Sequence, residues 1–113
     1  MTKTEICERV TQYRDSIEGK KRNPEDVEEY ILAYMKLWNL LLETGLYDWS
    51  FEEHFRNEKF TDTIAAVDTL SFEECCTYLS MIPRIHRLHG SWFWICIEDG
   101  SIYKLLSRLL EVM

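Results

Sequence analysis

Apolar residues recur along most of this chain at spacings of three and four, which is the period of an amphipathic α-helix. The first stripe comprises Ile6, Val10, Tyr13 and Ile17, within a helix expected from residue 4 to about residue 20. No segment shows a sustained alternation of apolar and polar positions, so strands are not expected. The pattern predicts an all-α fold, a compact single-domain bundle of five to seven short and medium helices.

The second predicted helix has the clearest start. Asn23 is a good N-cap, Pro24 fits the first turn, and the two acidic residues that follow complement the helix dipole. We expect this helix to run to about Glu43, with Gly45 near its C-cap. Its apolar stripe is wide, so we expect it to be the central helix of the fold. The stripe comprises Val27, Tyr30, Ile31, Tyr34, Leu37, Trp38, Leu41 and Leu42.

The sequence Ser-Phe-Glu-Glu occurs twice, starting at Ser50 and at Ser71, each time after an apolar residue. Both copies match the capping box, in which Ser bonds a backbone N–H three residues on and Glu reaches back. They predict a short helix over 51–56 and a longer one from 72 to about 88. A further short helix is expected over 62–68.

The C-terminal third carries the signals that disturb regular helices. Pro83 should kink or break its helix, which would leave 82–90 irregular. The aromatic and branched residues of 92–97 are the one place where a short strand is an alternative. Ser101 is expected to cap a last helix that runs to about Glu111. Its inward positions are Ile102, Leu105, Leu106, Leu109 and Leu110.

Composition narrows the class of protein. The chain has 113 residues, 46% of them hydrophobic, so residues 1–113 can form one domain with its own core. The first residues contain no apolar stretch typical of a signal peptide, and no apolar run is long enough for a membrane span. We therefore expect a cytoplasmic protein that does not enter membranes.

The net charge of −7 is unevenly distributed. Residues 1–22 carry a net +2, residues 23–82 a net −10, and residues 83–113 a net +1. An acidic middle argues against direct nucleic-acid binding, because phosphate contacts need Lys and Arg. It fits either a partner with a basic surface or a solvated face that maintains solubility. The predicted acidic surface comprises Glu25, Asp26, Glu28, Glu29, Glu52, Glu53, Glu73 and Glu74.

The candidate binding residues lie mostly between 84 and 94. Arg84 and Arg87 share a helix face, and the guanidinium fork suits carboxylates and phosphates. The same arginines could instead form salt bridges with the acidic middle of the chain. The full candidate set is Arg84, His86, Arg87, His89, Trp92, Trp94 and Arg108.

Trp92, Phe93 and Trp94 cannot all face inward on one helix, because successive residues point about 100° apart. At least one ring should be exposed or meet another chain. This run therefore predicts an aromatic contact surface, either for a homodimer or for a different protein.

Neither metal nor enzyme chemistry has a recognisable motif. His86 and His89 share a helix face, yet no metal-binding pattern accompanies them, so we expect no metal site. The cysteines lack the spacing of a zinc site and are expected to be reduced, buried, apolar-like residues. They are Cys7, Cys75, Cys76 and Cys96. No nucleophile motif or glycine-rich phosphate loop occurs, so we expect no cofactor and leave enzyme activity open, leaning against it.

The C-terminal segment resembles a family of small prokaryotic helical domains of unknown function, over residues 72–110. That family has an Arg-x-Glu-Arg-Phe stretch, a glycine a few residues later, an acidic-Gly turn and a leucine-rich helix ending in Arg-Leu. The matching stretches here are Arg84-Ile85-His86-Arg87-Leu88, Glu98-Asp99-Gly100 and Leu105-Leu106-Ser107-Arg108-Leu109. His86 and Leu88 depart from the pattern, where Glu and Phe are expected. The resemblance implies a helical fold and no known activity.

Three functions remain open on this basis. The leading expectation is a non-enzymatic protein-binding or accessory module of a prokaryote or phage. The first alternative is an inhibitor whose acidic middle mimics nucleic acid. The second is a small-molecule or anion-binding domain, or an enzyme, that uses Arg84, His86 and Arg87.

Overall fold

The computed structural model describes residues 1–19, 27–50, 67–86 and 92–113, apart from the side chains at 27, 85, 86 and 92. These residues form five α-helices and one 3-10 turn, and no strand occurs among them, so the predicted all-α class is confirmed. In chain order the elements are α1 (Lys3–Ile17), α2 (Val27–Thr44), η3 (Val67–Thr69), α4 (Phe72–His86), α5 (Trp92–Glu98) and α6 (Ser101–Val112).

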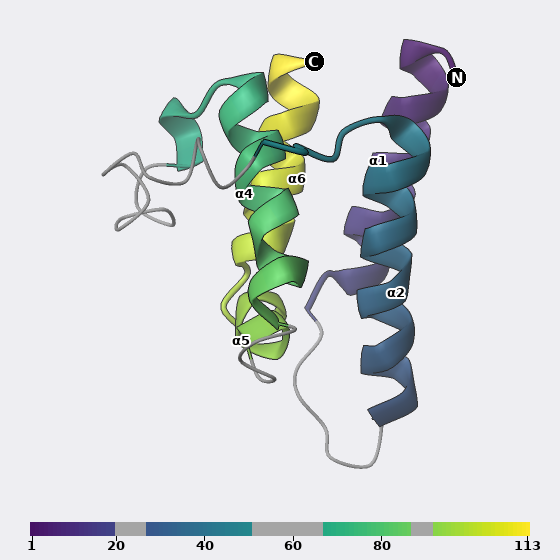
Figure 1. The fold of residues 1–113 in the computed structure, drawn as a ribbon, viewed down its shortest axis with the longest axis vertical. Coiled ribbons are helices and arrows are strands. Elements are labelled where there is room, and N and C mark those ends of the chain that lie inside the picture. The colour runs from purple at the N-terminus through teal and green to yellow at the C-terminus, as the bar shows by residue number, and fades with distance from the viewer. Residues whose placement is uncertain (20–26, 51–66, 87–91) are drawn as a thin grey trace.

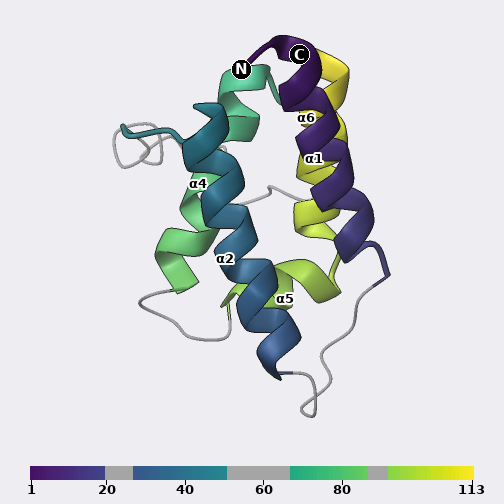
Figure 2. The same ribbon diagram turned by 90° about the vertical axis from the view of Figure 1, so that its right-hand side faces the viewer.

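The four longer helices run alternately in opposite directions and form a closed ring (Figures 1 and 2). Helix α1 contacts α2, α2 contacts α4, α4 contacts α6, and α6 contacts α1. The short helix α5 contacts α4 and α6 at one end of the bundle, and both chain termini lie at the other end. Short antiparallel helices therefore enclose one core.

The core follows the predicted stripes on the first and last helices. On α1, Val10, Tyr13 and Ile17 are buried, one turn apart. On α6, the predicted inward leucines and Ile102 are at most 1% exposed, apart from Leu110, which is half-buried. A repeat of three and four residues places such side chains on one face, which explains why these positions were predictable.

The two ends of α4 show one confirmed and one incorrect prediction. At its start, Glu74 N–H donates to Ser71 Oγ and Ser71 N–H donates to Glu74 Oε1, both over 3.2 Å, which is the predicted capping box. At its other end, Pro83 does not break the helix, because α4 continues to His86. Proline removes one backbone hydrogen bond, and the burial of Met81, Ile82 and Pro83 in the core outweighs that loss.

The start of α6 also differs from the prediction. Ser101 is the first helical residue, and Gly100 is the N-cap, with a φ of 81° that favours glycine. The capping acceptor is Asp99, whose Oδ1 receives Ser101 N–H over 2.8 Å and Ser101 Oγ–H over 2.5 Å. The Asp99 carboxylate, one residue before the N-cap, satisfies the free N–H of Ser101 better than a serine hydroxyl does.

Two further predictions need correction. The aromatic run at 92–97 is helical, as part of α5, and not a strand. Helix α2 is not the central helix, because α6 packs against α1, α4, α5 and η3, whereas Ile31 and Leu42 of α2 are each 47% exposed. Its predicted C-cap is confirmed, because Gly45 follows Thr44 with a φ of 75°. The expected cap at Asn23 and the helix expected over 51–56 lie outside the described residues, as does most of 62–68.

Tyrosine hydroxyls tie neighbouring helices together. The Tyr13 hydroxyl donates to the Ala33 carbonyl over 2.8 Å, which joins α1 to α2 inside the core. The Tyr34 hydroxyl donates to the Pro83 carbonyl over 3.2 Å, which joins α2 to α4. Such bonds fix how each helix is rotated about its axis and thus which of its faces remains outside.

Candidate functional site

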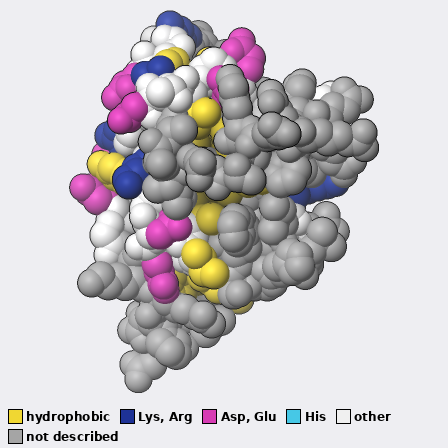
Figure 3. Space-filling model, turned by 90° about the vertical axis from the view of Figure 1, so that its left-hand side faces the viewer, with side chains coloured by type: hydrophobic (Ala, Val, Ile, Leu, Met, Phe, Trp, Pro, Cys, Tyr) yellow, Lys and Arg dark blue, Asp and Glu magenta, His cyan; other side chains and the backbone are white. Residues whose placement is uncertain are grey.

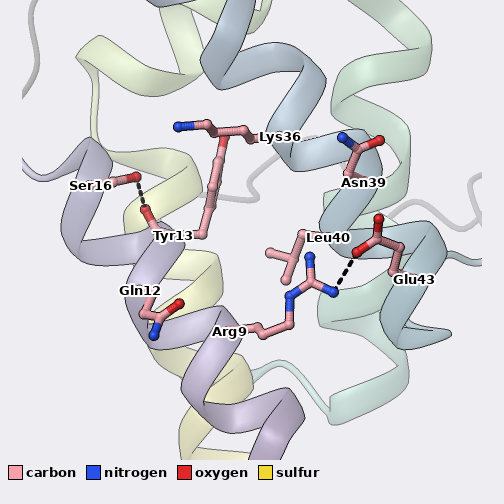
Figure 4. Close-up of a pocket in the computed structure, with 8 residues that line it drawn as sticks. All are labelled: Arg9, Gln12, Tyr13, Ser16, Lys36, Asn39, Leu40 and Glu43. Carbon is pink, nitrogen blue, oxygen red and sulfur yellow. Dashed lines mark hydrogen bonds and ion pairs between the residues drawn. The ribbon is translucent and has the colours of Figure 1, made fainter. Parts of the chain in front are cut away.

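A polar groove of about 300 Å³ lies between α1 and α2 (Figure 4). Both helices contribute polar side chains at positions i, i+3 and i+7, a spacing that places them on one face. The lining residues are Arg9, Gln12, Tyr13 and Ser16 from α1, and Lys36, Asn39, Leu40 and Glu43 from α2.

The floor of the groove is apolar and rigid. Tyr13 and Leu40 are buried there, and burial raises the pKa of the Tyr13 phenol far above its usual value. The phenol therefore stays neutral and keeps donating to the Ala33 carbonyl. The Ser16 hydroxyl donates to the Tyr13 carbonyl over 2.6 Å, as the dashed line in Figure 4 shows. The groove thus has a buried apolar base beneath its polar side chains.

Two cationic side chains cross the groove in opposite directions. Arg9 reaches from α1 toward α2, where its Nη1 lies 2.6 Å from Glu43 Oε2 (Figure 4). Lys36 extends from α2 toward α1, and no partner for its ammonium group is found among the described residues. With one carboxylate against two cations, the groove has a net charge of about +1 in a protein that is acidic as a whole.

The outer face of α2 is a second notable surface. Four large apolar side chains are each about half exposed on it: Ile31 at 47%, Leu32 at 53%, Met35 at 53% and Leu42 at 47%. Their positions on the helix place them on one broad stripe, and we call this stripe the α2 outer face. Trp49, shortly after the helix, is 80% exposed.

A second hollow, of about 490 Å³, opens at the end of the bundle that carries both termini. It is mainly apolar, with one residue of each charge at its edge. Its lining comprises Lys3, Ile6, Leu46, Phe72, Glu73, Val112 and Met113.

Of the predicted C-terminal binding residues whose side chains the structure describes, Arg84 and Arg108 do not lie together. Arg84 is half-buried in the last turn of α4. Arg108, on α6, donates from Nε to the Leu70 carbonyl over 2.9 Å, just before α4 begins. These two points are about 20 Å apart along α4, at 1.5 Å per residue. The bond to Leu70 thus links α6 to the turn before α4. Arg108 also pairs with Glu111 of its own helix over 3.2 Å.

The aromatic part of the prediction is only partly described. Phe93 is fully buried, and Trp94 is half-buried with its ring centroid 4.5 Å from that of Tyr30. Among the side chains of α5 that the structure describes, Ile95 is exposed, at 46%. Of the other candidates, Arg87 and His89 lie outside the described residues, as do the side chains of His86 and Trp92.

The predicted acidic surface is also described in part. Glu28, Glu29 and Glu73 are exposed, and Glu74 is half-buried in the cap of α4. On the face shown in Figure 3, the acidic side chains of the described residues are interspersed with lysines and arginines. The other four predicted members lie outside the described residues, namely Glu25, Asp26, Glu52 and Glu53.

The cysteines behave as buried apolar residues. Cys75, Cys76 and Cys96 are buried and Cys7 is half-buried, and all four are free thiols. Burial raises the pKa of Cys75 to about 11 and that of Cys76 and Cys96 to about 12, so these thiols are protonated at neutral pH. No group of side chains able to hold a metal ion occurs within the described ranges.

Comparison with protein-family models, with curated proteins and with solved structures finds no match to this chain. The resemblance of residues 72–110 to a family of prokaryotic helical domains therefore stays a prediction. In the part of the chain that the structure describes, none of the helices combines the length and apolarity that a bilayer crossing requires.

Proposed function

We propose that this protein is a non-enzymatic, cytoplasmic protein-binding module and that it binds through the α2 outer face. The observation that supports this is the half-exposure of four large apolar side chains on one helix. Such a contiguous stripe costs free energy in water, and contiguous exposed apolar patches typically mark interaction sites. Recognition of a helix face by apolar anchors about one turn apart is a common mode of peptide and protein binding.

The charged residues near the α2 outer face indicate the chemistry of the partner. Glu28 and Glu29 are exposed at the N-terminal end of this face, and Glu43, which pairs with Arg9, lies at its C-terminal end. A segment that presents apolar anchors flanked by lysine or arginine would match both features, since complementary charge favours encounter and fixes register. The proposed occupant is therefore a basic amphipathic helix of another protein.

A second copy of the chain is a poorer occupant of this surface. In a parallel two-fold arrangement, Glu28 and Glu29 would each face their own copies. In an antiparallel arrangement that places Ile31 against Leu42, the same two glutamates would face the end that carries Glu43. Both arrangements bring like charges together, which disfavours association.

The test uses two synthetic helical peptides with the same leucine pattern, one with lysine and one with glutamate at the polar positions. Binding is measured by fluorescence anisotropy at physiological salt. We expect the lysine peptide to bind and the glutamate peptide not to bind. Met35→Lys should weaken binding about tenfold or more, because it places a charge at the centre of the apolar stripe.

The matched control is Ile95→Lys, which makes the same change of charge at an equally exposed apolar residue on α5. Both substitutions are at the surface, so each should leave the free energy of unfolding within about 0.5 kcal/mol of the wild type. Equal weakening by the two variants would show that binding reflects net charge, and equal binding of the two peptides would show that charge does not select the partner. Either result would refute the proposal.

A further inference from the structure

The groove between α1 and α2 has features that folding alone does not require. Its polar side chains are exposed, and Lys36, Gln12 and Asn39 have no hydrogen-bond or ion-pair partner among the described residues. Arg9 uses one terminal nitrogen in its ion pair with Glu43, and its remaining donors have no such partner there. Two cationic groups and two amide groups thus line one hollow, in which Glu43 is the single carboxylate that the described residues contribute.

We propose that this groove binds a small organic anion that carries a carboxylate or phosphate group. Arg9 and Lys36 would hold the charged group, since guanidinium and ammonium are the usual partners of such anions. The amides of Gln12 and Asn39 would donate to its remaining oxygens. This site adjoins the α2 outer face, because Glu43 borders both, but its existence does not depend on the protein-binding proposal.

The size of the groove limits the ligand. About 300 Å³ is at the lower end of the range for small-molecule sites in proteins. The groove therefore suits a compact anion, such as a short dicarboxylate or a phosphorylated three-carbon compound, and is too small for a dinucleotide. The buried ring of Tyr13 and the side chain of Leu40 give the carbon part of such a ligand an apolar floor.

Glu43 has a specific role in this proposal. Its carboxylate lies 2.6 Å from Arg9 and competes with the ligand for the same guanidinium. The ion pair is partly exposed, with 34% and 56% of the two side chains accessible, so a ligand can displace it at little cost. Removal of the Glu43 charge should consequently strengthen anion binding, whereas removal of the Lys36 charge should weaken it.

The experiment is a titration followed by two-dimensional ¹H–¹⁵N NMR at constant ionic strength, with sodium succinate, sodium phosphate and the neutral analogue succinamide as probes. We expect at least one anion to cause saturable shifts at the amides of residues 9, 12, 36 and 39, and succinamide to cause none. Response to succinate alone identifies a carboxylate ligand, and response to phosphate alone identifies a phosphate ligand. The absence of saturable shifts in the groove with both anions would overturn the proposal.

Three variants decide whether the groove itself is responsible. Lys36→Met should weaken binding about fivefold, and Glu43→Gln should strengthen it by a similar factor, because each changes one unit of charge at the site. Lys104→Met removes an exposed cation from α6 and should leave the affinity unchanged. The proposal is refuted if Lys104→Met weakens binding as much as Lys36→Met, or if Glu43→Gln weakens it.

Discussion

Helices α2 and α6 are both rich in apolar residues, but the bundle uses them differently. Helix α6 contacts α1, α4, α5 and η3, and its residues Ile102, Leu105, Leu106 and Leu109 are at most 1% exposed. Helix α2 packs against α1 and α4 and also meets α5 through the rings of Tyr30 and Trp94, yet four of its large apolar side chains remain half exposed. The extent to which packing covers each helix, and not apolar content, distinguishes the two helices.

This difference distinguishes the helix whose apolar residues stabilise the fold from the helix that keeps apolar residues exposed for binding. On α6, the apolar residues Ile102, Leu105, Leu106 and Leu109 fill the core, whereas α2 carries more apolar side chains than its position in the ring can bury. Residues such as Tyr30, Leu37 and Leu41 already provide the buried face of α2. The outer stripe therefore contributes little to stability and remains available for a partner, which the following substitutions test.

The largest contrast is expected between Leu106→Ala and Leu32→Ala. Leu106 is fully buried, so its truncation should lower the free energy of unfolding by about 2–5 kcal/mol through lost burial and the cavity left behind. Leu32 is 53% exposed, and its truncation should change stability by less than about 0.5 kcal/mol. Urea denaturation followed by circular dichroism measures both. Similar losses for the two variants would show that the α2 outer face is part of the fold.

A smaller contrast is expected between two arginines. Arg108→Met on α6 removes the donor to the Leu70 carbonyl, and the half-buried position should make this cost about 1–2 kcal/mol. Arg9→Met on α1 removes only a partly exposed ion pair with Glu43, at less than about 1 kcal/mol. Chemical denaturation of both variants checks the order. The reverse order would mean that the groove, and not the contact of α6 with the α4 turn, stabilises the bundle.

The sequence predicted those parts of the fold that depend on near neighbours in the chain. The capping box at Ser71 and Glu74 was predictable because its two partners are three residues apart. The stripe of α6 was predictable because a helical period fixes its face. At Pro83 the same local reasoning failed, since the burial of this residue depends on contacts with distant helices.

The candidate site depends on how helices pair, which spacing within one helix does not reveal. Arg9 and Lys36 were not singled out, because polar residues at helical spacing are typical of any solvated face. They form a groove only because α1 packs beside α2. In the same way, Arg84 and Arg108 are close in the C-terminal third of the sequence and far apart in space. Residue type alone identified side chains that are able to bind an anion, but the packing of the helices determines which of them lie close together.

The capping of α6 gives a third, smaller test. Asp99→Ala removes the acceptor for both Ser101 N–H and Ser101 Oγ–H and should lower the free energy of unfolding by about 1 kcal/mol. Ser101→Ala removes only the hydroxyl bond and should cost less. Denaturation of the two variants under the same conditions measures the difference. A larger effect of Ser101→Ala would show that the Ser101 hydroxyl, and not the Asp99 carboxylate, caps α6.

The smallest effect at neutral pH concerns the buried thiols of α4 and α5. Burial, followed by the neighbouring Cys75 and acidic groups, raises the pKa of Cys76 to about 12, and burial similarly raises that of Cys96 to about 12. A thiol in the unfolded chain titrates near pH 8.5. Between these values the unfolded chain binds fewer protons than the folded chain, so stability falls as pH rises from about 8.5 toward 12 and is unaffected below that range.

Cys76→Ala should thus be less stable than the wild type at neutral pH through lost packing, and the difference in free energy of unfolding between the two should narrow as pH rises. Leu79→Ala, at a fully buried position of the same helix without a titratable group, should keep a constant gap. Urea denaturation from about pH 7 to pH 10.5 makes the comparison, and a constant gap for Cys76→Ala would show that its thiol is open to solvent, unlike the core that encloses α6.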